Sequence, residues 1–339
     1  MFSGWNDATL GLNSMLRKIL AVIAGLLAVV VLAAVVTAPS AIVHVPNEPT
    51  ISGGPDSYLA TAEATVAAAT PIIPGAEKRV RWFEGVQDRR TEYVLVYLHG
   101  FSATRQETAP VSEMIADSLQ ANLFETRLSG HGLVSDALAG VTAEQWLDDA
   151  IESLAIAKTL GDKIVLIGTS TGATLALAIV DHPLFDAVDS IVMISPNFSP
   201  FDPTSDLLTR PGGPQLAQFL VGETRSWTAA NEQQERYWST TYPTAALVEM
   251  MRLVDLANEQ LPLTLEQSVL TLYSPNDQVV SVERMQAALA RIDSPRMDTV
   301  ALEGSGDPSN HVLAGNILAP ENNAAVAGHI VRFLTASDL

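Results

Sequence analysis

The chain has 339 residues, of which 47% are hydrophobic, and its formal net charge at pH 7 is −19. This length is enough for one large domain with a well-buried core. The acidic balance argues against nucleic acid as a partner, because a phosphate backbone would be repelled. The absence of cysteine excludes disulfides, thiolate metal sites and cysteine nucleophiles.

The N-terminal part contains a long apolar segment. Residues 1–18 form a polar head that ends in Arg17-Lys18, and residues 19–38 then contain no charged side chain. A helix of that length spans about 30 Å, the thickness of the hydrocarbon core of a bilayer. Because basic residues stay on the cytoplasmic side, the head is expected in the cytoplasm and the rest of the chain in the periplasm or outside the cell. We therefore interpret residues 19–38 as a transmembrane signal anchor of a single-pass membrane protein.

A cleaved signal peptide is the competing interpretation of this segment. The apolar core of a signal peptide is usually only about 7–15 residues long, and this one is longer. The small residues at Val36-Thr37-Ala38 and at Pro39-Ser40-Ala41 are similar to cleavage sites, although Pro39 makes the first a poor one. After cleavage the protein would be secreted rather than anchored.

Residues 39–75 are rich in Pro, Gly, Ala and Thr, which predicts a linker and lead-in to the next domain, with one possible helix over 56–69. A linker of this kind would let the domain stand off the bilayer. The acidic surface of the domain would be repelled by anionic headgroups. Both features favour a substrate that arrives from the aqueous phase.

The remaining residues, 76–339, alternate between strand and helix patterns, which predicts an α/β domain with a doubly wound, mostly parallel sheet. Strands are predicted at 79–84, 93–98, 122–125, 163–167, 190–194, 269–273 and 297–302, and helices at 110–119, 142–160, 171–181, 282–292 and 321–334.

The alternation breaks over about 196–262, a stretch rich in proline and aromatic residues. This composition indicates an insertion over the C-terminal edge of the sheet, where a lid would lie. Trp227 and Trp238 are its candidates for substrate-binding residues. The alternative is a decorated loop that packs on the core and has no part in binding.

The sequence Gly168-Thr169-Ser170-Thr171-Gly172 follows an apolar strand and precedes a helix rich in small residues. This is the context of a nucleophile elbow, in which side chains at Gly168 and Gly172 would collide with the strand or the helix. Ser170 would project at the top of the sheet, and the Thr171 amide beside it would bind the negative oxygen that forms during acyl transfer. An ordinary turn before a helix is the simpler alternative.

A serine nucleophile needs a base to take its proton and a third group to orient that base. His311 lies in the loop after the last strand, and Asp277 lies in the loop after the preceding strand. With Ser170 they all follow parallel strands, whose carboxyl ends meet at one edge of a sheet. The alternatives are a turn-capping role for Asp277, a local hydrogen bond for His311, and Asp307 in place of Asp277.

A second amide for the negative oxygen is expected after the strand at 93–98, where the chain reads Leu98-His99-Gly100-Phe101. Gly100 lets the chain turn, and the Phe101 amide is the natural donor. A plain strand-to-helix turn is the alternative. His131, within a Ser-Gly-His-Gly segment, is expected to shape a loop.

The segments LHGFSAT, TRLSGHG, GTSTG, SPNDQVV and NHVLAG, in this order, resemble the α/β-hydrolase superfamily, and most closely its carboxylesterase and monoacylglycerol-lipase branch. The resemblance covers residues 79–334. It implies a triad of Ser170, Asp277 and His311, with the Phe101 and Thr171 amides as the oxyanion hole. The chain departs from the pattern at Thr171, where Met, Gln or Ala is frequent, and at Ala173, where a further Gly is common.

The resemblance implies a serine hydrolase that cleaves a carboxylic ester through an acyl-enzyme, with a small or medium acyl ester or a monoacylglycerol-like substrate. Acyl transfer and amide cleavage by the same residues remain open, as does a non-catalytic, membrane-anchored binding protein on this fold. No metal cluster, dinucleotide motif or phosphate loop is evident in the sequence, so no cofactor is expected. The oligomeric state is left open.

Overall fold

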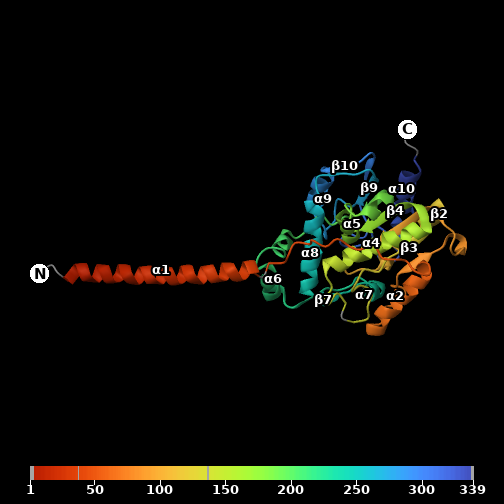
Figure 1. The fold of residues 1–339 in the computed structure, drawn as a ribbon. Helices are drawn as coiled ribbons and strands as arrows, with labels where there is room; N and C mark the ends of the chain where they lie inside the picture. The colour runs from red at the N-terminus through yellow and green to blue at the C-terminus, as the bar shows by residue number, and fades with distance from the viewer. Residues whose placement is uncertain (1–3, 37, 136, 337–339) are drawn as a thin grey trace.

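The computed structural model describes residues 4–36, 38–135 and 137–336. Helix α1 (Gly4–Val36) projects away from the remainder of the chain, which folds into one α/β body (Figure 1). The segment Met15–Ala33 of this helix is long and apolar enough to cross a membrane, and none of it is buried against the protein. A signal sequence would have the same features.

The body is built on a seven-stranded sheet in the order β1-β3-β2-β4-β5-β9-β11. Strand β1 runs antiparallel to β3, and every other neighbouring pair is parallel. The predicted α/β fold with a mostly parallel sheet is therefore confirmed. The strands are β1 (Arg79–Arg81), β2 (Thr91–Leu98), β3 (Asn122–Glu125), β4 (Gly161–Thr169), β5 (Val188–Ile194), β9 (Ser268–Tyr273) and β11 (Met297–Ala301).

Helices cover both faces of the sheet because side chains alternate along each strand. On β2, Val94 and Val96 join the core beneath one set of helices, whereas Leu95 and Tyr97 join the core beneath the other. The first set is α4 (Ala143–Leu160), α5 (Thr171–Ala178), α8 (Thr244–Glu259) and α9 (Val282–Leu289), and the second is α3 (Val111–Leu119) and α10 (Asn323–Thr335).

Local sequence signals explain several boundaries. Helix α4 begins with a capping box, in which the Gln145 side chain accepts a hydrogen bond from the Thr142 amide at 3.0 Å. Helix α5 ends at Ala178, three residues before the expected end. His182, which follows that helix, caps the next turn by accepting a hydrogen bond from the Leu184 amide.

The predicted insertion divides into two parts. Its first part holds only short elements: η4 (Pro203–Leu207), α6 (Gly213–Val221), β6 (Thr224–Ser226), α7 (Glu232–Tyr237) and β7 (Thr241–Pro243), with β6 and β7 paired. Its last part is α8, which packs against α5 and α4 and contributes buried residues such as Met251 and Leu253 to the core. Beyond α8 a small parallel pair follows, β8 (Leu263–Thr264) with β10 (Ile292–Asp293).

The segment between α1 and helix α2 (Pro55–Ala69) lies along the domain, and we call its residues 38–54 the strap. The Ser40 carbonyl accepts from Arg252 Nε at 3.0 Å, and His44 Nε2 is 2.7 Å from an Asp148 oxygen. Ile42 packs against the core, and the Pro46 carbonyl is 3.1 Å from His182 Nε2. The strap is thus attached at several points, whereas a free spacer was expected here.

Candidate active site

Ser170 occupies the sharp turn between β4 and α5. Its φ of 52° and ψ of −115° form a conformation that residues other than glycine rarely adopt, and such strain is typical of functional sites. The Ser170 amide is held by the Ile194 carbonyl at 2.8 Å. A Cβ on Gly168 would lie 2.5 Å from the backbone of Gly172, and one on Gly172 would lie 2.0 Å from the Leu98 carbonyl oxygen. Both glycines are therefore required, as the sequence predicts.

His311 and Asp277 meet as the sequence predicts. His311 Nδ1 is 2.8 Å from Asp277 Oδ2, and both side chains are almost fully buried. The other oxygen of Asp277 accepts from the amides of Val279 and Val280 at 2.8 and 3.0 Å. With Nδ1–H donated to a carboxylate fixed in this way, Nε2 is left as the basic nitrogen.

Asp307 has a different role from Asp277. Its Oδ2 accepts from the amides of His311 and Val312 at 2.9 and 3.0 Å and from the Ser309 hydroxyl at 2.6 Å. These bonds shape the backbone of the histidine loop. The hydrogen bond to the imidazole ring is made by Asp277.

The surroundings of His311 favour its charged form. Burial by itself lowers the pKa of His311, but the carboxylates of Asp277, Glu107 and Asp307 outweigh burial and raise that pKa above its ordinary value. The imidazole must be neutral to accept a proton, so it becomes an effective base only as the pH rises through this raised pKa.

The two amides expected to bind the oxyanion are available. On either side of Phe101, the Gly100 amide donates to Glu107 Oε2 at 2.9 Å and the Ser102 amide donates to His131 Nε2 at 3.0 Å. Neither the Phe101 amide nor the Thr171 amide donates to an acceptor within the described part of the chain. Free amides beside a serine nucleophile are what an oxyanion hole requires.

Glu107, in the 3-10 helix η2 (Arg105–Glu107), is a site residue that the sequence analysis missed. It is buried, and besides the Gly100 amide it accepts from the Tyr97 hydroxyl at 3.1 Å. Burial raises its pKa to about 7, although the bond from Gly100 works in the opposite direction. A Cβ on Gly100 would lie 2.8 Å from Glu107 Oε1 and 3.3 Å from Ser170 Cβ, so the carboxyl group lies close to Ser170.

Two buried histidines support the loops around the site. His99 Nε2 accepts from the Leu128 amide at 3.0 Å, while His131 accepts from Ser102 and so shapes a loop as predicted. Burial lowers the pKa of His99 well below its usual value and that of His131 to about 4. Both imidazoles are therefore neutral hydrogen-bond acceptors at physiological pH.

The insertion contacts the loop that carries Phe101. The Ser239 amide donates to the Ser102 carbonyl at 2.7 Å, and the Tyr242 ring lies edge-on to Phe101 at 5.2 Å between centroids. The candidate pocket residue Trp238 is buried in a cluster with Ala103, Val312 and Leu318, and Trp227 packs against the same cluster. Among the residues that the structure describes, no group of His, Asp and Glu is arranged to hold a metal ion.

Comparison with known proteins places this fold and site in a family. The model of the alpha/beta hydrolase family matches residues 95–327, which is more than half of the chain. The chain belongs to the alpha/beta hydrolase family. The predicted resemblance is confirmed by this match.

Several of the similar proteins are named as lipases or lipolytic enzymes. The thermostable monoacylglycerol lipase of Bacillus sp. (strain H-257) is 24% identical over 211 residues, which cover 62% of this chain and 81% of that protein. A metagenome-derived lipolytic enzyme shares the fold with a TM-score of 0.62 and 18% identity, over 78% of this chain and 98% of the other. The monoacylglycerol lipase of Paleococcus ferrophilus shares the fold with a TM-score of 0.56 and 14% sequence identity. The match covers 76% of this chain and 98% of that protein.

Proposed function

We propose that this alpha/beta hydrolase cleaves carboxylic esters through an acyl-enzyme formed on Ser170. The observation that carries the proposal is the 2.8 Å contact between His311 Nδ1 and Asp277 Oδ2. It joins two loops from neighbouring strands, β9 and β11, at the carboxyl edge of the sheet where Ser170 sits in its strained turn. The family and its ester-cleaving relatives support the same chemistry.

The reaction follows from these roles. Ser170 Oγ attacks the ester carbonyl while His311 Nε2 takes its proton, and Asp277 stabilises the imidazolium that forms. The amides of Phe101 and Thr171 bind the negative oxygen of the tetrahedral intermediate. The intermediate expels the alcohol, which receives the proton from His311. Water, deprotonated by the same imidazole, then releases the acid and restores the free serine.

The substrate class we favour is a small or medium acyl ester or a monoacylglycerol. The name of the Bacillus relative supports this class, because it is a monoacylglycerol lipase that matches most of the catalytic domain. Thr171 is buried directly after the nucleophile, and its hydroxyl has no partner among the described residues. This branched side chain would narrow the acyl side of the pocket.

We further propose that α1 anchors the enzyme, with the catalytic domain on the exported side of the membrane. The apolar segment Met15–Ala33 supports the anchor, and Arg17-Lys18 at its leading end supports the orientation. Membrane fractionation together with the N-terminal sequence of the mature protein tests this. A soluble form that begins at Pro39 or Ile42 would identify the helix as a cleaved signal peptide.

Labelling with a fluorophosphonate probe tests the chemistry, with Ser170→Ala as the control. The wild type should react covalently and hydrolyse p-nitrophenyl esters, whereas Ser170→Ala should lose labelling and fall at least about 10⁴-fold in turnover with unchanged thermal unfolding. A variant that keeps more than about a hundredth of the activity would mean that Ser170 is not the nucleophile. Adding an alcohol or amine acceptor to the same assay separates hydrolysis from acyl transfer. A wild type that neither reacts nor turns over would favour a binding protein.

A further inference from the structure

We propose that helix α6 lies in the surface of the membrane that holds α1, and that the insertion draws its ester substrate from this bilayer. The second half rests on the proposed ester hydrolysis, whereas the first half does not. The argument starts from the sequence of α6, Gly213–Val221, which has no charged side chain although the chain as a whole carries a net charge of −19.

Helix α6 exposes most of its apolar side chains. Only Gly213 is fully buried, whereas Phe219 is 86% exposed and Leu220 is 69% exposed. Leu216 and Val221 on the same helix are also exposed. A contiguous apolar surface of this kind on a folded domain marks a site of interaction, because water alone does not favour it.

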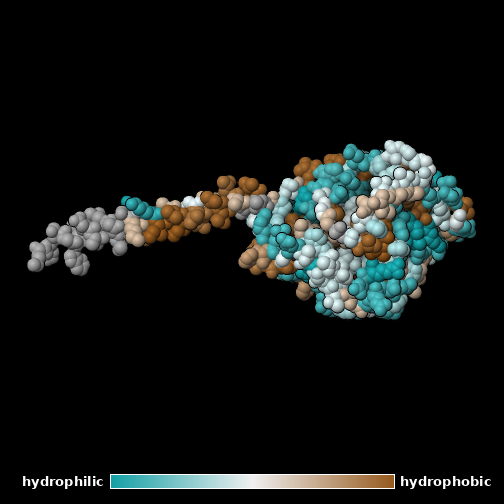
Figure 2. All heavy atoms as spheres, turned by 90° about the horizontal axis from the view of Figure 1, so that it is seen from below, coloured by the Kyte–Doolittle hydropathy of each residue, from teal (hydrophilic) through white to brown (hydrophobic). Residues whose placement is uncertain are grey.

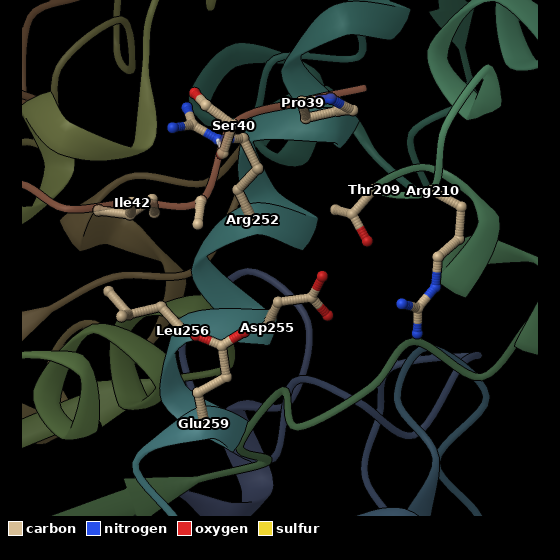
Figure 3. Close-up of a pocket in the computed structure, with 10 residues that line it drawn as sticks. Pro39, Ser40, Ile42, Thr209, Arg210, Arg252, Asp255, Leu256 and Glu259 are labelled. Atoms are coloured by element: carbon tan, nitrogen blue, oxygen red, sulfur yellow. Dashed lines mark hydrogen bonds between the residues drawn. The ribbon is translucent and has the colours of Figure 1, made fainter. Parts of the chain in front are cut away.

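The position of α6 indicates what covers it. Figure 1 draws α6 directly beside the end of α1, and Figure 2 shows apolar surface at this end of the domain. Pro39 and Ser40 of the strap line the same cavity, of about 190 Å³, as Thr209 and Arg210, which shortly precede α6 (Figure 3). The strap is attached to the domain from Ser40 onward.

The connection from α1 to the domain is short. Three residues lie between Val36, where α1 ends, and Ser40, and the four residue-to-residue steps from Val36 to Ser40 span at most about 14 Å when extended. If α1 spans a bilayer, this end of the domain is therefore held close to the bilayer surface. Helix α6 is also only about 14 Å long, too short to cross the membrane, so it suits a position in the interfacial layer.

The charges of α6 itself and of Arg210 before it are compatible with a bilayer as the occupant. The nearby carboxylates lie off the helix: Asp255 and Glu259 line the cavity, and Glu223 follows α6. No carboxylate on α6 would be repelled by anionic headgroups. Arg210, shortly before the helix, is exposed and forms no ion pair among the described residues. A guanidinium at the level of the headgroups is attracted to lipid phosphate. We therefore assign the apolar face of α6 to lipid rather than to a second copy of the chain.

The same insertion leads from α6 to the site. Helix α6 is followed by β6, which pairs with β7, and Tyr242 of β7 packs on Phe101. The Ser239 amide is bonded to the Ser102 carbonyl in the same loop. A lipid ester that leaves the bilayer along α6 thus reaches the loop beside Ser170. This path replaces the aqueous substrate expected from the acidic surface.

Site-specific labelling tests where α6 lies. Because the chain has no cysteine, Phe219→Cys gives a single reactive thiol in the full-length protein, and Val86→Cys gives a control that is 43% exposed. Val86 belongs to the connection between β1 and β2, away from α6 in the sequence and in the fold. With bimane labels in nanodiscs, doxyl-labelled phosphatidylcholine should quench the label at 219 and leave the label at 86 unaffected.

Two labelling results would overturn the proposal. A label at 219 that stays exposed to water in nanodiscs would show that α6 does not contact lipid. A label at 219 that is shielded without lipid, to a degree that depends on protein concentration, would identify a second copy as the occupant.

Kinetics test the path of the substrate. The double variant Phe219→Ser with Leu220→Ser should hydrolyse 1-oleoylglycerol held in the nanodisc about tenfold more slowly, which corresponds to about 1.4 kcal/mol. Its hydrolysis of p-nitrophenyl acetate should stay at the wild-type rate, as should both activities of the control Val86→Ser. Unchanged hydrolysis of the bilayer substrate would refute the path. If the wild type cleaves neither ester, the proposed function fails, while the quenching result still decides where α6 lies.

Discussion

Buried carboxylates occur in two regions of this domain with opposite surroundings. In the first region, Lys78 lies directly before β1 and bonds to two carboxylates of α4, Asp149 at 3.1 Å and Glu152. The lysine side chain is only 8% exposed. At the carboxyl edge of the sheet, neither Glu107 nor Asp277 forms an ion pair with a lysine or arginine in the described part of the chain. There the cation available to Asp277 is the imidazolium of His311.

The difference distinguishes carboxylates that stabilise the fold from carboxylates to which we assign a part in the proposed chemistry. Burial by itself lowers the pKa of Lys78, but its two carboxylates outweigh burial and raise that pKa above its ordinary value, so this cluster keeps its charges. In the proposed mechanism the charge of His311 changes during the reaction, and burial raises the pKa of Glu107 to about 7. The protonation of a buried carboxylate without a permanent cation can therefore change when the charge on His311 changes.

The largest effect is expected from the pair Asp277→Asn and Asp307→Asn. Asp277→Asn should lower kcat about 10³–10⁴-fold, because the imidazole loses the group that fixes its tautomer and stabilises its charged form. Asp307→Asn should change kcat less than about tenfold, because Asp307 bonds to the loop backbone and not to the ring. Steady-state kinetics on one p-nitrophenyl ester measure both. Equal losses of kcat in the two variants would mean that Asp277 is not the only carboxylate that orients the imidazole, and that Asp307 shares this role.

Removing the permanent cation from the structural cluster should affect stability instead. Lys78→Met leaves the largely buried carboxylates of Asp149 and Glu152 without a cation, with only the Ser129 amide and the Tyr58 hydroxyl as donors among the described residues, which should lower the free energy of unfolding by about 3–5 kcal/mol. Denaturant unfolding at neutral pH measures this loss, and kcat of the folded fraction should stay unchanged. Lys163→Met, which removes an exposed and solvent-screened pair with Glu92, is the matched control and should leave the free energy of unfolding almost unchanged. Similar losses for the two variants would contradict the contrast between the regions.

A smaller effect, on the pH profile, is expected for Glu107. The Glu107 carboxylate contributes to the raised pKa of His311, so Glu107→Gln should lower that pKa. Since His311 acts when neutral, the rise of kcat/KM with pH should then begin at lower pH, with a loss of about tenfold at the plateau. Glutamine still accepts from the Gly100 amide, whereas Glu107→Ala does not and should lose more activity. Identical pH profiles for all three proteins would make Glu107 purely structural.

The smallest effect is expected from the insertion. Trp238 packs against Ala103 and Val312, which flank the proposed site residues, so Trp238→Ala should change the ratio of activities on long-chain and acetyl esters about threefold to tenfold. A series of p-nitrophenyl esters measures the ratio. Trp227→Ala, at the edge of the same cluster, should act in the same direction but more weakly. Equal loss on every ester would make this part of the insertion a structural cover.

The sequence predicted best where local pattern and tertiary role agree. The strand before Gly168, the tight turn at Ser170 and the loop positions of Asp277 and His311 each have a local signal, and the pairing of β9 with β11 then brings Asp277 and His311 within hydrogen-bond distance. Glu107 has no such signal, because its burial depends on Tyr97 and Gly100 rather than on its own turn. The strap was predicted as a linker because its proline-rich composition does not reveal hydrogen bonds to distant residues such as Arg252. Helix α8 was hidden within the insertion because prolines surround it.

The close approach of Gly172 to Leu98 also has a consequence for how substrate preference can diverge. A Cβ on Gly172 would lie 2.0 Å from the Leu98 carbonyl oxygen, so backbone meets backbone between the helix that carries Thr171 and the strand that leads to Phe101. The spacing of the two proposed oxyanion amides is thus set by main chain, with no side chain between them. Substitutions in the pocket lining or the insertion can then change which ester is accepted without displacing the amides. The spacing of the proposed oxyanion amides and the choice of ester can therefore change independently of each other.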